Sequence, residues 1–267
     1  MSDRKVAVVT GASRGIGKQT SLLLAQRGYQ LVLAARTEEP RANTPGTLGE
    51  TASAVEEFGC EPLVVRADLA EQADVESVVV RTLERFGRAD VLVNNAAYTV
   101  GKTLFTHIPD LTREQWEKHF AINVTAPLML IQGFWDSMKA AGGGVVVNVT
   151  SGASYLREVS PEAENSTGLP ENGPAYGASK AALNRMANVI AQEGLRHRIA
   201  VINLEPGFVL TETMAATFAQ ARVENSRAIS PVVPATAITH MVTCPDPMVY
   251  TGQIVSAPQL VEGLPDA

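Results

Sequence analysis

The chain has 267 residues, of which 45% are hydrophobic and 19% are charged. This length and composition predict a compact globular protein with one large α/β domain or two small ones, and they exclude the disordered and fibrous classes. The net charge of −6 offers no electrostatic surface for nucleic acid or for an anionic membrane, so we expect neither as a partner.

Two features bear on the cellular compartment. Cys60 and Cys244 could form one disulfide at most, which is unlike a disulfide-rich secreted scaffold. Only four apolar residues separate Lys5 from Thr10, which is too short for a signal sequence, and no apolar run approaches the length of a membrane span. We therefore expect a cytoplasmic protein.

The chain alternates short apolar runs, rich in β-branched residues, with longer helical patterns. Because the runs are apolar on both faces, they are typical of strands that are covered by helices on both sides. Six strands are predicted at residues 5–10, 31–35, 62–66, 91–94, 145–150 and 199–204.

The helical patterns between these strands have recognisable ends. Residues 16–27 and 74–86 each stop at a glycine, as helices commonly do. Thr112 and Gln115 form a capping-box pattern, which predicts the start of a helix that continues to Ala141. Strand and helix alternate throughout, so the expected architecture is α/β, with a doubly wound parallel sheet and no domain linker.

Two stretches interrupt this alternation. Residues 37–50 are rich in Pro, Gly and Thr, and residues 155–174 contain three prolines and four glutamates. Both are predicted to be long loops, which in compact domains tend to be functional or disordered.

A glycine-rich loop follows the first strand and opens the first helix, with the sequence Thr10-Gly11-Ala12-Ser13-Arg14-Gly15-Ile16-Gly17. Glycines let the backbone turn sharply and approach a pyrophosphate, and the helix N-terminus offers unpaired N–H groups to it. A tight connection without a ligand is the alternative, but the position between strand and helix favours a dinucleotide phosphate site.

The end of the second strand indicates which dinucleotide binds. An acid that would accept hydrogen bonds from a ribose 2′-hydroxyl is absent there, and Arg36 stands in its place. A guanidinium pairs well with a 2′-phosphate, and Arg14 could supply a second cation. NADP is therefore favoured over NAD, unless both arginines are merely solvated surface groups.

Tyr176 and Lys180 are four residues apart at the start of a predicted helix. This spacing places both side chains on one helical face, where an ammonium can stabilise a phenolate. Because a free tyrosine has a pKa of about 10, acid and base catalysis near neutral pH requires that pKa to be lowered. The pair alone is a weak signal and gains weight from the motifs around it.

These motifs occur in a fixed order over nearly the whole chain: Thr10-Gly11 through Gly17, Asn94-Asn95-Ala96, Asn123, Ser151, Tyr176 to Lys180, and Pro206-Gly207. In this order they resemble the short-chain dehydrogenase/reductase family. The resemblance implies a three-layer Rossmann-type fold in a single domain over residues 1–267, a nicotinamide cofactor, and hydride transfer between that cofactor and an alcohol or carbonyl.

The resemblance also assigns catalytic roles. Tyr176 matches the general acid/base of the family, and Lys180 matches the residue that lowers the tyrosine pKa and holds the nicotinamide ribose. Ser151 matches the hydroxyl that orients the substrate oxygen, with Ser154 as the weaker candidate. Asn123 matches the helix asparagine that holds a water joining the lysine to solvent.

For the cofactor, the resemblance places Asp68 and Leu69 at the adenine, Asn95 beside the adenosine ribose, and residues 206–211 at the nicotinamide carboxamide. Asp68 as a helix cap and Thr211 as a turn residue are the alternatives. The full set expected to bind the cofactor is Gly11, Ser13, Arg14, Gly15, Ile16, Gly17, Arg36, Asp68, Leu69, Asn95, Tyr176, Lys180, Pro206, Gly207, Val209 and Thr211.

The chain departs from the family pattern in several places. Ala97 replaces a usual glycine, and the stretch from Ser151 to Tyr176 is longer than usual, which predicts an insertion at residues 155–174 near the mouth of the active site. Residues 250–255 resemble the last strand of the family, but the glycine pair expected after it is absent, which leaves a homotetramer and a homodimer both open.

The four histidines show no metal-ligand spacing, so they are predicted to be surface groups, and no metal is expected.

The expected function is reversible hydride transfer between NADP(H) and a small carbonyl or secondary alcohol. The alternatives are an NAD-dependent enzyme of the same family and a dinucleotide-binding regulator without turnover. Residues 211–234 should cover the substrate, but they contain no pattern specific to one substrate class.

Overall fold

The computed structural model describes residues 4–39, 45–99, 104–156, 173–215 and 228–265. Its centre is a single sheet of seven parallel strands in the order β3-β2-β1-β4-β5-β6-β7. The strands are β1 (Val6–Thr10), β2 (Gln30–Ala35), β3 (Leu63–Arg66), β4 (Val91–Asn94), β5 (Gly144–Val149), β6 (Ile199–Glu205) and β7 (Ile254–Ser256).

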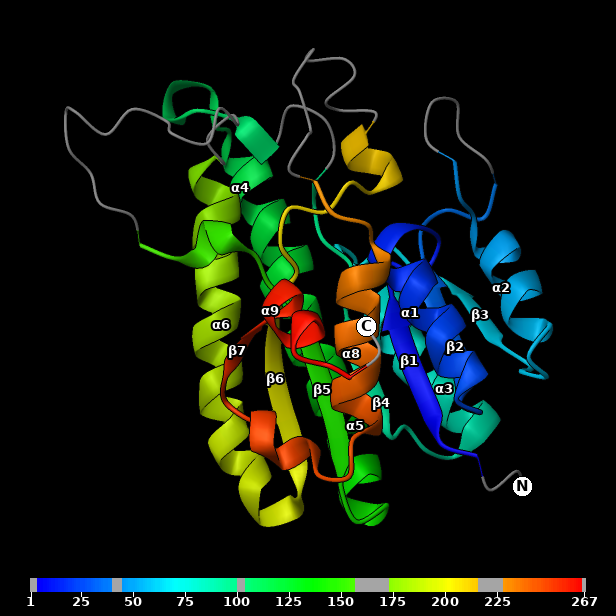
Figure 1. Ribbon diagram of the computed structural model, residues 1–267. Helices are drawn as coiled ribbons and strands as arrows, with labels where there is room; N and C mark the ends of the chain where they lie inside the picture. Colours follow the sequence, from blue (N-terminus) through cyan, green and yellow to red (C-terminus); the bar gives the residue numbers. More distant parts are fainter. Residues whose placement is uncertain (1–3, 40–44, 100–103, 157–172, 216–227, 266–267) are drawn as a thin grey trace.

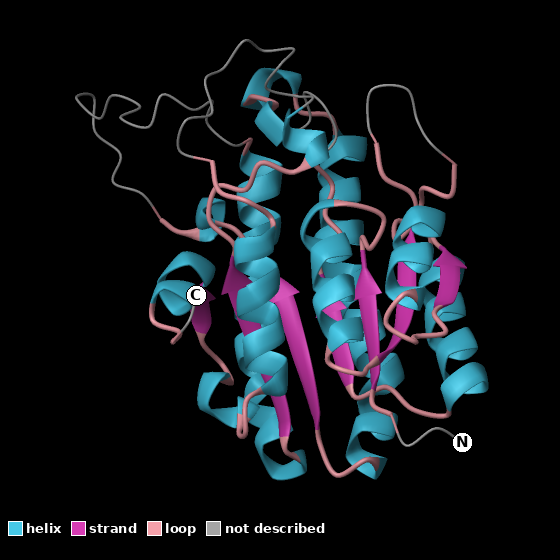
Figure 2. Ribbon diagram, turned by 45° about the vertical axis from the view of Figure 1, so that its right-hand side comes forward, coloured by secondary structure: helices cyan, strands magenta, loops and turns pink. Residues whose placement is uncertain are grey.

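Helices cover both faces of this sheet and give the fold three layers, as Figures 1 and 2 show. One face packs against α1 (Gly15–Gln26), α2 (Leu48–Glu56), α8 (Val232–Thr243) and α9 (Ala257–Glu262). The other face packs against α3 (Gln72–Phe86), α5 (Ala126–Ala140) and α6 (Pro174–Gly194). Because each strand is apolar on both faces, both layers are needed to remove it from water. The expected doubly wound, Rossmann-type α/β fold is confirmed.

The six predicted strands agree with β1 to β6 to within a residue at each end. The seventh was predicted at residues 250–255 and is shorter, because Pro247–Tyr250 form a 3₁₀ turn and the strand begins only at Ile254. Asp246 stabilises this turn, since its carboxylate accepts the N–H of Met248 at 3.2 Å.

The helix predicted from Thr112 to Ala141 has the expected capping box, but it is not continuous. Helix α4 (Arg113–Phe120) leads into a π-helical turn at Ala121–Thr125, and α5 follows. Pro127 supplies a physical reason: it has no N–H to donate to the carbonyl of Asn123, and its ring would crowd that carbonyl in a regular helix. The π turn therefore sits at the asparagine of the sequence motif.

The stretch 37–50 was predicted to be loop throughout, and its last residues prove to be helical. Helix α2 begins at Leu48, because the Thr47 side chain caps it by accepting the N–H of Glu50 at 3.1 Å. Residues 40–44 of this stretch and residues 157–172 of the expected insertion lie outside the described residues. No helix of the described part of the chain has the length and apolar character needed to cross a membrane.

Candidate active site

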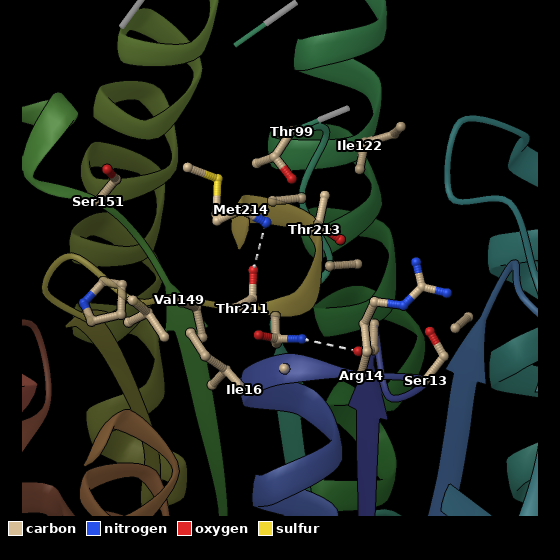
Figure 3. Close-up of a pocket in the computed structure, with 18 of the residues that line it drawn as sticks. Ser13, Arg14, Ile16, Thr99, Ile122, Val149, Ser151, Thr211, Thr213 and Met214 are labelled. Carbon is tan, nitrogen blue, oxygen red and sulfur yellow. Dashed lines mark hydrogen bonds between the residues drawn. The ribbon is translucent and has the colours of Figure 1, made fainter. Parts of the chain in front are cut away.

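A cavity of about 440 Å³ opens at the carboxyl ends of the strands. It lies above β1 and β4, where the strand order reverses direction, and this is the usual ligand site of a doubly wound sheet. The predicted site residues that line it are Gly11, Ser13, Arg14, Gly15, Ile16, Arg36, Asp68, Leu69, Asn95, Ser151, Tyr176, Lys180, Pro206, Gly207, Val209 and Thr211. Figure 3 shows several of these side chains around the cavity.

The glycine-rich loop forms one wall of the cavity. Gly11 and Gly15 have φ values of 66° and 55°, in the left-handed region that glycine adopts without strain. Gly17 does not line the cavity, but a Cβ there would lie 2.3 Å from the Gly11 carbonyl oxygen, so only glycine fits behind the loop. The N-terminus of α1 carries no side-chain cap, and its N–H groups suit an anionic ligand.

Thr10 and Asn95 hold this loop against the neighbouring strand end. The Thr10 hydroxyl accepts the N–H groups of Asn95 and Ala96 at 3.0 and 3.1 Å. In return, the Asn95 side-chain amide donates to the carbonyls of Thr10 and Gly11 at 2.9 and 3.3 Å. These bonds fix the backbone shape of the loop before any ligand arrives.

Both arginines selected from the sequence lie at one end of the cavity. Arg36 is 3.8 Å from the Asp68 carboxylate, with about one third of each side chain exposed. Arg14 donates to the carbonyl of Gly46 at 2.7 Å, so its guanidinium is held beside the cavity. Asp68 also accepts the N–H of Ala70 at 3.1 Å, which is a turn before α3 and not a cap of that helix, since α3 begins at Gln72 with Glu71 as its N-cap residue.

Ser151, Tyr176 and Lys180 lie at the other end. Ser151 follows β5 and lies near the Tyr176 side chain, whose pKa it lowers, and the Lys180 ammonium lies 5.9 Å from the centre of the Tyr176 ring. Ser154 instead donates to the Ser151 carbonyl and accepts from Asn184, at 2.7 and 2.8 Å, which leaves Ser151 as the hydroxyl at the cavity.

Burial shifts the pKa values of both Tyr176 and Lys180. It raises the pKa of Tyr176, an effect that the Ser151 hydrogen bond partly offsets and the Glu205 charge reinforces. Burial also lowers the pKa of Lys180 to about 8, and its ammonium donates to the Val149 carbonyl at 2.8 Å. The phenol is therefore protonated near neutral pH, which is the state needed by a group that gives a proton to a substrate oxygen.

The segment that follows β6 closes the cavity. A short bridge pairs Val209 with Ile229, with backbone hydrogen bonds of 3.0 and 2.8 Å at Leu210 and Phe208. The Thr211 hydroxyl accepts the N–H of Met214 at 3.3 Å, as Figure 3 shows. Of the segment expected to cover the substrate, residues 216–227 lie outside the described residues.

A family model described as short chain dehydrogenase matches residues 5–222. The chain belongs to the short-chain dehydrogenase family. This family catalyses oxidoreduction with a bound nicotinamide dinucleotide, and the cavity described above has the glycine loop and the open helix N-terminus that such a cofactor requires.

Individual relatives of this short-chain dehydrogenase agree with the assignment. An uncharacterized oxidoreductase of Thermotoga maritima is 32% identical over 211 residues, which are 79% of this chain and 73% of the relative. The short chain dehydrogenase/reductase astE of Aspergillus oryzae is 34% identical over 80% of this chain and 74% of its own. L-Sorbose reductase from Gluconobacter frateurii, solved with NADPH and L-sorbose, has a TM-score of 0.79 at 26% identity and covers 95% of this chain and 94% of its own.

Asn123 of this short-chain dehydrogenase is fully buried and does not line the cavity. Its side-chain oxygen accepts the N–H of Tyr98, and its amide donates to Ser179, both at 3.0 Å. Ser179 in turn donates to the Tyr176 carbonyl at 2.8 Å. Asn123 therefore supports the first turn of α6 from behind the site.

The prediction that the four histidines are surface groups is wrong for His119, which is fully buried. Its ring meets Tyr98 and Tyr176 edge-on, with centroid distances of 4.9 and 6.0 Å. The spacing of four residues between His119 and Asn123 could have indicated a shared helical face directed at the site. Among the described residues, no group of three or more acidic, His or Cys side chains could hold a metal ion.

Sequence reasoning missed part of the lining, namely Thr99, Leu104 and Phe105. Thr213 and Met214, which lie in the segment expected to cover the substrate, also border the cavity, and Figure 3 places them with Thr99 around its centre. Thr99 and Leu104 belong to no motif and flank a stretch outside the described residues, so no local pattern marked them.

Proposed function

We propose that this chain is an NADP(H)-dependent oxidoreductase that interconverts a small carbonyl compound and the corresponding secondary alcohol. The observation that carries the proposal is the division of one cavity into two chemically distinct ends. One end holds the cations Arg14 and Arg36, and the other holds Ser151, Tyr176 and Lys180. A nicotinamide cofactor bound along the cavity supplies the hydride.

The residues of this chain supply the proton and orient the substrate carbonyl. Ser151 and Tyr176 hydrogen-bond the carbonyl oxygen, and Tyr176 transfers its phenolic proton as negative charge develops there. Lys180, buried beside the tyrosine ring, stabilises the phenolate that remains. Asn123 keeps the first turn of α6 in place, so the tyrosine and lysine stay aligned.

The preference for NADP is expected to depend on Arg36. Replacing Arg36 with Ala should weaken NADPH binding by about 10-fold or more, because a charge-assisted pair with the 2′-phosphate is lost, while NADH binding changes little. Fluorescence titration with both cofactors measures this ratio. Arg66→Ala is the matched control, since Arg66 is exposed and does not line the cavity. Tighter binding of NADH, unaltered in Arg36→Ala, would contradict the proposal.

Turnover itself is tested with a panel of carbonyl substrates, followed by the loss of NADPH absorbance. The panel includes ketoses, because the neighbour from Gluconobacter frateurii was solved with L-sorbose, together with aliphatic ketones and aldehydes. We expect at least one class to be reduced by the wild-type chain. A protein that binds NADPH but reduces no member of a broad panel would instead support the regulator alternative.

The remaining expectations concern organisation. We propose that residues 1–267 act as one catalytic domain, with residues 155–174 near the mouth of the site, and that the chain assembles as a homodimer or homotetramer in the cytoplasm. The two cysteines support a reducing compartment, because neither forms a disulfide and Cys60 is buried.

A further inference from the structure

Glu205 is a carboxylate that no sequence motif selected, and it lies close to the reacting groups. It is the last residue of β6, whose neighbour β5 leads directly into Ser151. The pairing of Val149 with Leu204 continues as a hydrogen bond of 2.8 Å from Thr150 N–H to the Leu204 carbonyl. Glu205 is therefore aligned with the residue that precedes Ser151.

The carboxylate itself approaches the same segment. A Cβ built on Gly152 would lie 3.8 Å from Oε1 of Glu205, so the charge faces the backbone that carries Ser151. Oε1 also accepts the N–H of Gly207 at 2.9 Å, which fixes the carboxylate at the start of the segment closing the cavity. Its position is thus set by two elements that border the site.

The charge of this carboxylate has no ion-pair partner among the residues that the structure describes. Within the described part of the chain, no Lys, Arg or His nitrogen lies within 4.0 Å of Glu205. The residue is also half-buried, so water screens its field less than it would at the surface. An unpaired carboxylate in such a place acts on any titratable group nearby.

We propose that Glu205 opposes Lys180 at Tyr176 and keeps the proton on the phenol until a substrate oxygen takes it up, so that carbonyl reduction is favoured near neutral pH. This inference rests on the proposed function, since it requires Tyr176 to be the group that exchanges the proton. Glu205 contacts neither substrate nor cofactor. It is a positioning residue, because it acts only through the effect of its charge on Tyr176.

The electrostatics of the site support this role. Glu205 raises the pKa of Tyr176, in the same direction as burial, and it also raises the pKa of Tyr155 on the short turn after Ser151. The other titratable groups that face Tyr176 are Lys180 on α6 and His119 on α4. Burial is the largest cause of the raised pKa of Tyr176, Glu205 adds to it, and the nearby Lys180 ammonium favours the phenolate, so the charge of Glu205 is one of the factors that set the acidity of the phenol.

The test is the pH dependence of alcohol oxidation, which requires the phenolate and therefore rises as Tyr176 loses its proton. In Glu205→Gln the amide oxygen still accepts the Gly207 N–H, but the charge is gone. We expect the rising limb of kcat/KM for oxidation to move to lower pH by about half a unit to one unit, because the phenol becomes more acidic. The falling limb for reduction should move in the same direction, and the Kd for NADPH should stay within about twofold.

Two further variants separate charge from structure. Glu193→Gln removes one negative charge from an exposed position on α6 and should leave the profile unchanged. Glu205→Ala removes the charge and also the acceptor for Gly207. If Glu205→Gln retains the wild-type profile while Glu205→Ala loses activity, Glu205 is only a turn-forming residue and the inference is wrong.

The failure of the proposed function would look different. If turnover survives replacement of Tyr176 by Phe, Tyr176 is not the group that exchanges the proton. The proposed function then fails together with the role of Glu205. An inactive Tyr176→Phe variant together with an unshifted Glu205→Gln profile would overturn the role of Glu205 alone.

Discussion

Replacing Tyr176 with Phe should lower kcat for carbonyl reduction by about 100- to 10,000-fold, the usual contribution of a positioned general acid. The substitution removes one oxygen from a side chain that is 9% exposed, and it leaves the ring that packs against His119. NADPH should bind nearly as in the wild type, because the glycine loop and the two arginines are unchanged. Steady-state kinetics and a fluorescence titration of NADPH measure the two effects.

Tyr155→Phe is the matched control for this variant. It removes the same oxygen from a tyrosine that also feels the Glu205 charge, but that side chain is half exposed and does not line the cavity. Its kcat should remain within about twofold of the wild type, as is usual for an exposed residue away from the chemistry. A Tyr176→Phe variant with normal kcat would show that another group supplies the proton.

Replacing Gly17 with Ala should damage both stability and cofactor binding. The new Cβ would lie 2.3 Å from the Gly11 carbonyl oxygen and 2.6 Å from the Asn95 amide nitrogen, so the glycine loop must move. Overpacking of this kind costs about 1–3 kcal/mol of folding free energy. Because the loop wall is displaced, the affinity for NADPH should fall by about 10-fold or more, at about 1.4 kcal/mol for each factor of ten.

Thermal unfolding with and without NADPH measures both parts of this expectation, since a ligand that binds the native state raises its Tm. Gly49→Ala is the control: its Cβ would meet only the Thr47 hydroxyl at 3.9 Å, and alanine favours the helix there. A Gly17→Ala protein with wild-type Tm and a wild-type rise in Tm with NADPH would show that the loop does not need this close approach.

Much of the fold could be predicted because its signals are local. The strands are runs of Val, Leu and Ile apolar on both faces, and the capping box at Thr112 and Gln115 forms as its spacing indicates. The break in the helix at Ala121–Thr125 was missed, although Pro127 is a local signal for it. Helix α2 was missed because the composition of residues 37–50 concealed the Thr47 cap near their end.

The residues of the site likewise differ in whether a local sequence signal marks them. Motif order brought together the residues that line the cavity, because each is fixed to the end of a strand or the start of a helix. His119 and Glu205 belong to no motif, and their places near Tyr176 arise from contacts between residues distant in sequence, such as the ring contact of His119 with Tyr176. Asn123 was selected as a site residue from the sequence, and its contacts show that it supports α6 from behind the cavity.

The chain on either side of residues 157–172 has a consequence for protein engineering. Before this stretch, Ser151 accepts the N–H of Ala153 at 3.2 Å and its carbonyl accepts the Ser154 hydroxyl. After it, the N–H of Gly173 donates to the Leu104 carbonyl at 2.8 Å, and Pro174 starts α6. The backbone on both sides of the stretch is thus anchored by bonds between described residues. If Ser151 and Tyr176 exchange the proton as proposed, a designer seeking new substrates could join these two anchors with segments of other length and composition.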